Sequence, residues 1–72
     1  MLILSQNKEF LIELGEYPIG IMQDGLKYQI VACTEEANIL LGEYYSPQAA
    51  KDILAEIFRI YGGASKYEMP EG

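Results

Sequence analysis

The sequence contains no histidine and no tryptophan, and Cys33 is its only cysteine. Histidine is the side chain that most often moves protons near neutral pH, so acid–base catalysis lacks its usual residue. A single thiol cannot form an intramolecular disulfide, and without histidine it leaves no ordinary set of zinc ligands. We therefore expect a protein that is not an enzyme and holds no cofactor or metal, with Cys33 as a small core residue.

Basic side chains are also scarce, because five lysines and arginines stand against eleven acidic residues and give a formal net charge of −6. The five are scattered along the chain, which leaves no positive stripe for a phosphate backbone. Direct nucleic-acid binding is therefore not expected. Two interpretations of the acidic excess stay open: it keeps the protein soluble, or it attracts a basic partner.

Long apolar runs are absent as well. The apolar opening at residues 1–4 is interrupted by polar residues 6–9 before a signal-peptide core would end. No run approaches the roughly 20 residues that cross a bilayer. These absences predict a cytoplasmic protein with no membrane partner.

Carboxylate pairs and glycines are the remaining candidates for a catalytic or ligand-binding site. Glu35 with Glu36, or Glu16 with Glu43, could flank a sugar bond or hold a hard cation, but no calcium-loop spacing of alternate acidic residues occurs. The glycines form no phosphate-binding loop. A small-ligand or carboxylate-metal protein is therefore the weakest of the functional alternatives.

The 72 residues fit a single domain, 1–72. A core of this size rarely supplies more than about 3–5 kcal/mol of net stability unless something else helps. Since disulfides and zinc are excluded, association with another chain is the remaining source of stability.

Alternating and branched apolar residues predict five short strands, at residues 2–5, 9–14, 19–23, 27–33 and 38–44. Asp24 and Gly25 predict a type I′ hairpin turn between the third and fourth strands. In the fifth strand, alternation places Ile39 and Leu41 on one side and Leu40 and Tyr44 on the other.

A helix is predicted over residues 47–61. Ser46 followed by Pro47 is typical of a helix start, and Gly62 with Gly63 is typical of its end. Apolar residues at spacings of three and four predict its inner face, which comprises Ala50, Ile53, Leu54, Ile57, Phe58 and Tyr61.

The tail, residues 63–72, has two interpretations: it is flexible, or residues 66–70 add an edge strand that ends at Pro70. The predicted fold is α+β. It comprises an antiparallel meander sheet of four to five short strands, with one C-terminal helix packed on one face and an extra edge strand in the tail as an option.

Tyrosine is the one abundant residue of note, with six copies. Its ring supplies apolar area with a polar tip, and it is enriched at interfaces. For any single tyrosine, completing the core is the competing interpretation. The candidate interaction surface comprises Tyr17, Tyr44, Tyr45 and Tyr67.

Residues 41–54, which read LGEYYSPQAAKDIL, together with residues 67–71, which read YEMPE, resemble small uncharacterised proteins of Gram-positive bacteria and their phages. The resemblance covers the C-terminal half by sequence and the first half by pattern. It implies a meander sheet, one helix and a mobile-element or accessory context, and it carries over no functional residue.

The leading functional expectation is a phage-type accessory protein that acts by protein–protein contact as a homodimer. One helix cannot cover both faces of such a sheet, which leaves Leu11, Val31, Leu40 and tyrosine surface for self-association. The alternative is an acidic inhibitor that mimics nucleic-acid phosphate and enters the basic groove of a host defence enzyme.

Overall fold

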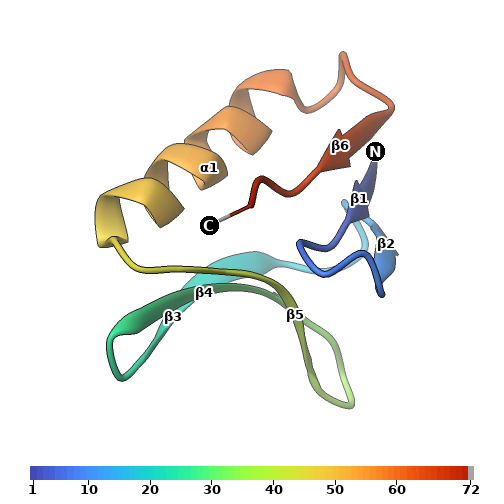
Figure 1. Cartoon of the computed structure of the whole chain (residues 1–72). Coiled ribbons are helices and arrows are strands. Elements are labelled where there is room, and N and C mark those ends of the chain that lie inside the picture. Colours follow the sequence, from blue (N-terminus) through green and yellow to red (C-terminus); the bar gives the residue numbers. More distant parts are fainter. Residues whose placement is uncertain (72) are drawn as a thin grey trace.

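The computed structural model describes residues 1–71, which form six short strands and one helix (Figure 1). In chain order the elements are β1 (Leu2–Leu4), β2 (Leu11–Glu13), β3 (Ile19–Asp24), β4 (Lys27–Cys33), β5 (Asn38–Tyr44), α1 (Pro47–Ile60) and β6 (Lys66–Glu68). The α+β class and the order of the elements agree with the sequence prediction. The first two strands are shorter than predicted.

The strands form two separate sheets, so the predicted single antiparallel meander is wrong. Sheet A has the order β2-β1-β6, and sheet B has the order β3-β4-β5. In sheet A, β1 pairs antiparallel with β2 and parallel with β6, which makes this sheet mixed. The meander is broken between β2 and β3, where Gly15 adopts a φ of 115° and Pro18 has no N–H to donate.

Sheet B begins with the predicted hairpin, but its turn is of a different type. Asp24 pairs with Lys27, so the two central residues of the turn are Gly25 and Leu26. Gly25 has a φ of 61°, whereas Leu26 is not among the residues with positive φ. A glycine at the first central position is typical of a type II′ turn, so the type I′ prediction is wrong.

A bulge in β5 changes which side chains reach the core. Ile30 pairs with Gly42 and Val31 pairs with Leu40, which leaves Leu41 as an extra residue. Beyond an extra residue the alternation of side chains shifts by one position. Leu41 and Tyr44 therefore both enter the core, although simple alternation placed them on opposite faces.

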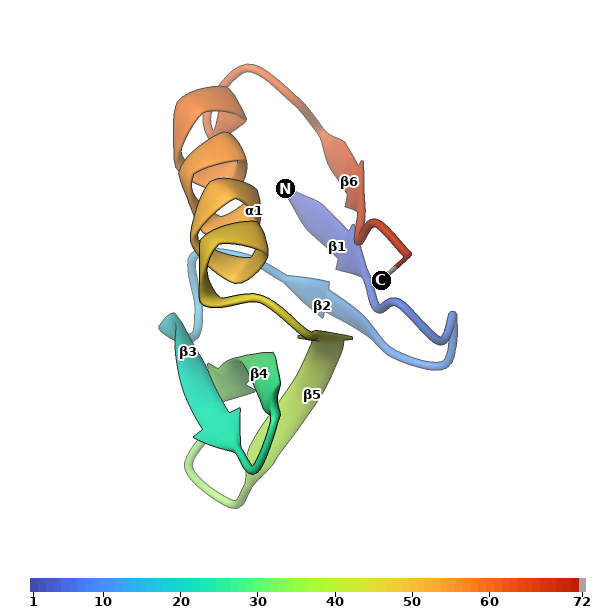
Figure 2. The ribbon, with the colours of Figure 1, turned by 60° about the vertical axis from the view of Figure 1, so that its left-hand side comes forward.

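The helix α1 lies over one face of sheet B, with sheet A beside it (Figure 2). At its start, the Ser46 hydroxyl accepts hydrogen bonds from the amides of Gln48 and Ala49, and Pro47 follows the cap as predicted. The helix ends one residue earlier than predicted, and Gly62 takes the expected positive φ of 94°. Across the described residues, no helix has the length and apolar character needed to cross a membrane.

The tail forms the edge strand β6, and hydrogen bonds of Met69 and Pro70 join the residues after this strand to the rest of the chain. Met69 is 1% exposed, and its amide donates a 3.0 Å hydrogen bond to the carbonyl oxygen of Leu4. Of the two interpretations of the tail, the structure has the edge strand, over Lys66–Glu68, and Gly72 lies outside the described residues. The core that joins the two sheets and the helix comprises Ile3, Ile12, Ile30, Ala32, Leu41, Tyr44, Ala50, Ile57 and Met69.

Candidate functional site

The four tyrosines predicted as an interaction surface lie in different environments. Tyr44 is 3% exposed, so its ring is part of the core and is not available to a partner. Tyr67 is half-buried on β6, and its hydroxyl group is buried. Tyr17 and Tyr45 lie beyond opposite ends of sheet B. Tyr17 comes just before Pro18, whose carbonyl oxygen accepts a hydrogen bond from Cys33 at one end, and Tyr45 comes just after Tyr44, which pairs with Tyr28 at the other end. The four residues therefore do not form one continuous surface.

Tyr45 is the one member of this set that is largely exposed, at 73%. The ammonium group of Lys27 lies 6.0 Å from the centre of its ring, which is the outer limit of a cation–π contact. Whether Tyr45 or Tyr17 contacts a partner stays a prediction.

The two buried phenol groups differ in their hydrogen bonding. The Tyr44 hydroxyl donates a 2.7 Å hydrogen bond to the carbonyl oxygen of Pro70, and burial raises its pKa. The Tyr67 hydroxyl has no partner in hydrogen-bonding geometry among the described residues. Burial, followed by the nearby carboxylate of Glu56, raises the pKa of Tyr67 to about 12. Both phenols therefore remain protonated and uncharged at neutral pH.

Cys33 is exposed, so its predicted place in the core is wrong. It follows the buried Ala32 at the end of β4, and successive side chains of a strand point to opposite faces. The thiol therefore lies on the face of sheet B that is opposite to α1.

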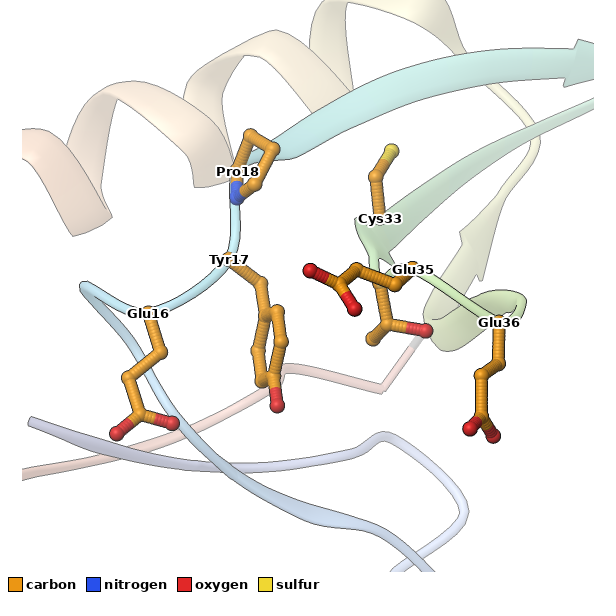
Figure 3. Close-up of a pocket in the computed structure, with 7 residues that line it drawn as sticks. Glu16, Tyr17, Pro18, Cys33, Glu35 and Glu36 are labelled. Atoms are coloured by element: carbon orange, nitrogen blue, oxygen red, sulfur yellow. The ribbon is translucent and has the colours of Figure 1, made fainter.

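Cys33 lines an acidic hollow of about 750 Å³ at one end of sheet B (Figure 3). The hollow lies between the segment before β3 and the loop between β4 and β5, and its carboxylates are Glu16, Glu35 and Glu36. Figure 3 shows Glu16 and Glu36 on opposite sides of the Tyr17 ring, and the Cys33 thiol pointing away from the carboxylates. Within residues 1–71, no group of three acidic or cysteine side chains is arranged to hold a metal ion.

A second surface is the outer face of sheet A. The register places Ile3 beside Ile12 and Tyr67, and these three side chains face the core. The alternate side chains face outward. They comprise Leu2, Leu4, Leu11, Glu13, Lys66 and Glu68, which we call the outer face of sheet A.

The centre of this outer face is apolar. Leu2 is 37% exposed and Leu11 is 61% exposed, and with Leu4 they line a shallow hollow of about 550 Å³. The expectation that Val31 and Leu40 also remain exposed is not met, because Val31 is buried and Leu40 is half-buried. Of the three apolar residues predicted to be left over, Leu11 is the one that stays open to solvent.

A third surface is an apolar groove of about 530 Å³ between α1 and the segment that leads into β3. Tyr17, Pro18 and Ile19 lie on one side of it, and Leu54, Phe58 and Tyr61 lie on the other. Phe58 is 86% exposed, although the sequence pattern placed it on the inner face of the helix. It follows the buried Ile57, and one residue turns about 100° around the helix axis, so its ring points past the edge of the sheet.

Sequence reasoning missed this groove because Phe58 fits the apolar spacing of α1 as well as its buried neighbours do. Leu2 and Leu4 were also missed as surface residues, although their alternation with Ile3 was a usable signal. No model of a known protein family, no curated protein and no solved structure matches this chain. The functional proposals below therefore rest on the geometry and charge of these surfaces.

Proposed function

We propose that the protein acts by binding other protein chains rather than by catalysis, and that it self-associates through the outer face of sheet A. The observation that carries the proposal is the apolar row of Leu2, Leu4 and Leu11 on this face. Exposed side chains that are adjacent on a sheet mark association surfaces more often than isolated ones do.

The charges at the border of this face suit a second copy of the same chain. Leu2 pairs with Glu13 on one side and with Lys66 on the other, so opposite charges flank the apolar row. A twofold axis parallel to β1 would place β2 of one copy over β6 of its partner. Each Glu13 would then face a Lys66, Leu2 and Leu4 would pack against their own copies, and Leu11 would lie over the side chain of Glu68.

Self-association also compensates for the small core. A standard interface buries about 800 Å² on each partner. The accessible surface of this chain is 4753 Å², so such an interface would cover roughly a sixth of it. The leucines would occupy the centre of that area, with polar side chains at its rim.

Sedimentation velocity on matched variants tests the proposal. We expect wild-type protein to sediment as a dimer at micromolar concentration, and Leu11→Gln to shift it toward monomer. Leu26→Gln is the control, because Leu26 is 87% exposed at the β3–β4 turn, away from this face. A wild-type monomer at all concentrations, or equal effects of the two variants, would contradict the proposal.

A charge exchange tests the arrangement of the two copies. Glu13→Lys and Lys66→Glu should each weaken the dimer, because each places two like charges opposite one another. The double variant should restore association. Failure of the double variant to recover would exclude this twofold arrangement without affecting the test of Leu11.

The acidic hollow supports a second candidate, which is an inhibitor that presents carboxylates to a basic groove. Glu16, Glu35 and Glu36 form none of the ion pairs found among the described residues. Such binding should weaken steeply with salt and compete with duplex DNA. The phage or mobile-element context and the cytoplasmic location stay predictions.

A further inference from the structure

The strand β3 is an outer strand of sheet B, and one of its edges carries unpaired backbone groups. Asp24 pairs with Lys27 across a two-residue turn, and the Pro18 carbonyl oxygen accepts a 2.9 Å hydrogen bond from the Cys33 amide. In an antiparallel ladder, backbone groups point toward the partner strand at every second residue. Even-numbered positions of β3 therefore face β4.

The odd-numbered positions of β3 face away from β4. Ile19, Ile21 and Gln23 direct their N–H and C=O groups to this open edge, and in the described chain none of these groups forms a hydrogen bond outside the sheet. The side chains of Ile19 and Ile21 pack against the core beneath α1. A strand added to this edge would therefore place alternate side chains on the helix side.

The apolar groove lies next to this edge and continues its apolar surface. Ile19 belongs to both features, and Leu54, Phe58 and Tyr61 form the helix side of the groove. Phe58 and Tyr61 are 86% and 53% exposed, so two aromatic rings stand open beside unpaired backbone groups. An extended chain can satisfy both, because its backbone bonds to the edge while its side chains enter the adjacent groove.

Charge at one end of the groove indicates the chemistry of such a chain. The groove and the acidic hollow share Tyr17 and Pro18, so they adjoin each other at these residues. Carboxylates from Glu16, Glu35 and Glu36 surround the hollow, and the whole chain carries a net charge of −6. A segment that extends past Ile19 would therefore gain from lysine or arginine at that end.

We infer that the open edge of β3 and the apolar groove bind an extended segment of another protein. The segment adds a fourth strand to sheet B, places apolar side chains at alternate positions against α1, and carries lysine or arginine over the acidic hollow. A second copy of this chain fits less well. Antiparallel pairing of two β3 strands would bring Glu16 of one copy toward Asp24 of the other.

This surface differs from the outer face of sheet A, so the two proposals can fail independently. Leu11 variants test self-association and leave the groove unchanged. Phe58 variants test the groove and leave the outer face of sheet A unchanged.

Two synthetic peptides test the inference, each with alternating isoleucine and threonine. One carries three lysines at its N-terminus and the other carries them at its C-terminus, because the strand could add in either direction. A peptide of the same composition without the alternation is the control. In an NMR titration with peptide up to millimolar concentration, we expect one of the two to shift the amide signals of Ile19, Ile21 and Gln23. Absence of binding by both peptides, or shifts mapped to other residues, would overturn the inference.

Two modifications separate strand addition from nonspecific attraction. N-methylation of the peptide amides that face β3 should abolish binding, whereas methylation of the opposite edge should preserve it. Phe58→Gln should weaken binding about fivefold or more, and Leu26→Gln, at a similarly exposed position, should not. Equal binding by both methylated peptides would contradict strand addition.

The charge contribution is tested by replacing Glu16, Glu35 and Glu36 with glutamine. This variant should bind the lysine peptide more weakly and with less dependence on salt, whereas Asp24→Asn should match wild type. Shifts of the β3 amides on concentrating the protein without peptide would identify a second copy as the occupant and overturn the inference.

Discussion

The hydroxyl group of Tyr44 donates a 2.7 Å hydrogen bond to the backbone carbonyl oxygen of Pro70. This bond joins sheet B to the tail that follows β6. Space for the ring exists because residue 42 is glycine, where a Cβ atom would lie 2.7 Å from the Tyr44 hydroxyl oxygen. Met69 in this tail is thus part of the core, and removal of Met69 and Pro70 would leave the Leu4 carbonyl group and the Tyr44 hydroxyl group without these hydrogen-bond partners.

A pair of tyrosine substitutions tests the importance of this bond. Tyr44→Phe should lower the free energy of unfolding by about 1 kcal/mol, because it removes the shorter of the two hydrogen bonds that the Pro70 carbonyl oxygen accepts and leaves only the one from the Gln6 side chain. Tyr67→Phe should be neutral or slightly stabilising at neutral pH, because the hydroxyl that it removes is buried without a hydrogen bond. Urea denaturation measures both, and a larger loss for Tyr67→Phe than for Tyr44→Phe would contradict this assignment.

Stability should fall at high pH because of Tyr67. Burial in the folded protein raises its pKa from the ordinary value of 10.0 to about 12. The unfolded chain therefore loses this proton at a lower pH than the folded chain does. The contribution is fully present below pH 10.0 and is lost as the pH rises toward about 12.

Burial of Tyr44 raises its pKa and acts in the same direction. Denaturation midpoints measured across this pH range should decline less steeply for Tyr67→Phe than for wild type. Parallel profiles for the two proteins would show that the phenol of Tyr67 ionises equally easily in the folded and unfolded states.

Met69 should be among the most sensitive positions, although it lies near the end of the chain. Met69→Ala should cost about 2–5 kcal/mol, because the side chain is fully buried and its loss leaves a cavity. The core of so small a domain rarely supplies more than about 3–5 kcal/mol of net stability, so this variant should be partly unfolded. Met22→Ala is the control, since Met22 is 47% exposed. Circular dichroism should show less helix in Met69→Ala than in Met22→Ala. Equal helix content in the two variants would contradict this prediction.

Cys33 should react with a thiol reagent in the folded protein, because its side chain is exposed at the end of β4. Cys33→Ser should change stability by less than about 0.5 kcal/mol, as for other surface substitutions. Protection of the thiol until the protein unfolds would show that a further contact covers this end of sheet B.

Local features of the fold were predictable because their signals lie within a few residues. Ser46 and Pro47 fix the helix start, and Gly62 fixes its end through a conformation that most residues avoid. The pairing of β1 with β6 was not predictable in the same way. This pairing joins Ile3 to Tyr67, which lie near opposite ends of the sequence. The alternation of apolar residues predicts that a segment is a strand, but it does not predict which other strand will pair with it.

The candidate surfaces were predictable to a smaller extent. Alternation in β2 identified Leu11 as an outward residue. The bulge at Leu41 reversed the expected position of Tyr44, since one inserted residue shifts every later side chain to the other face. The groove beside β3 depends on which strand lies outermost in sheet B, which is a property of the assembled sheet.

The most direct test of self-association through the outer face of sheet A is a dilution series followed by the backbone amide signals of the wild-type protein. From millimolar to low micromolar concentration, we expect the changes to map to Leu2, Leu4, Leu11, Glu13, Lys66 and Glu68. Signals that do not change with concentration, or changes confined to β3 and α1, would contradict this assignment.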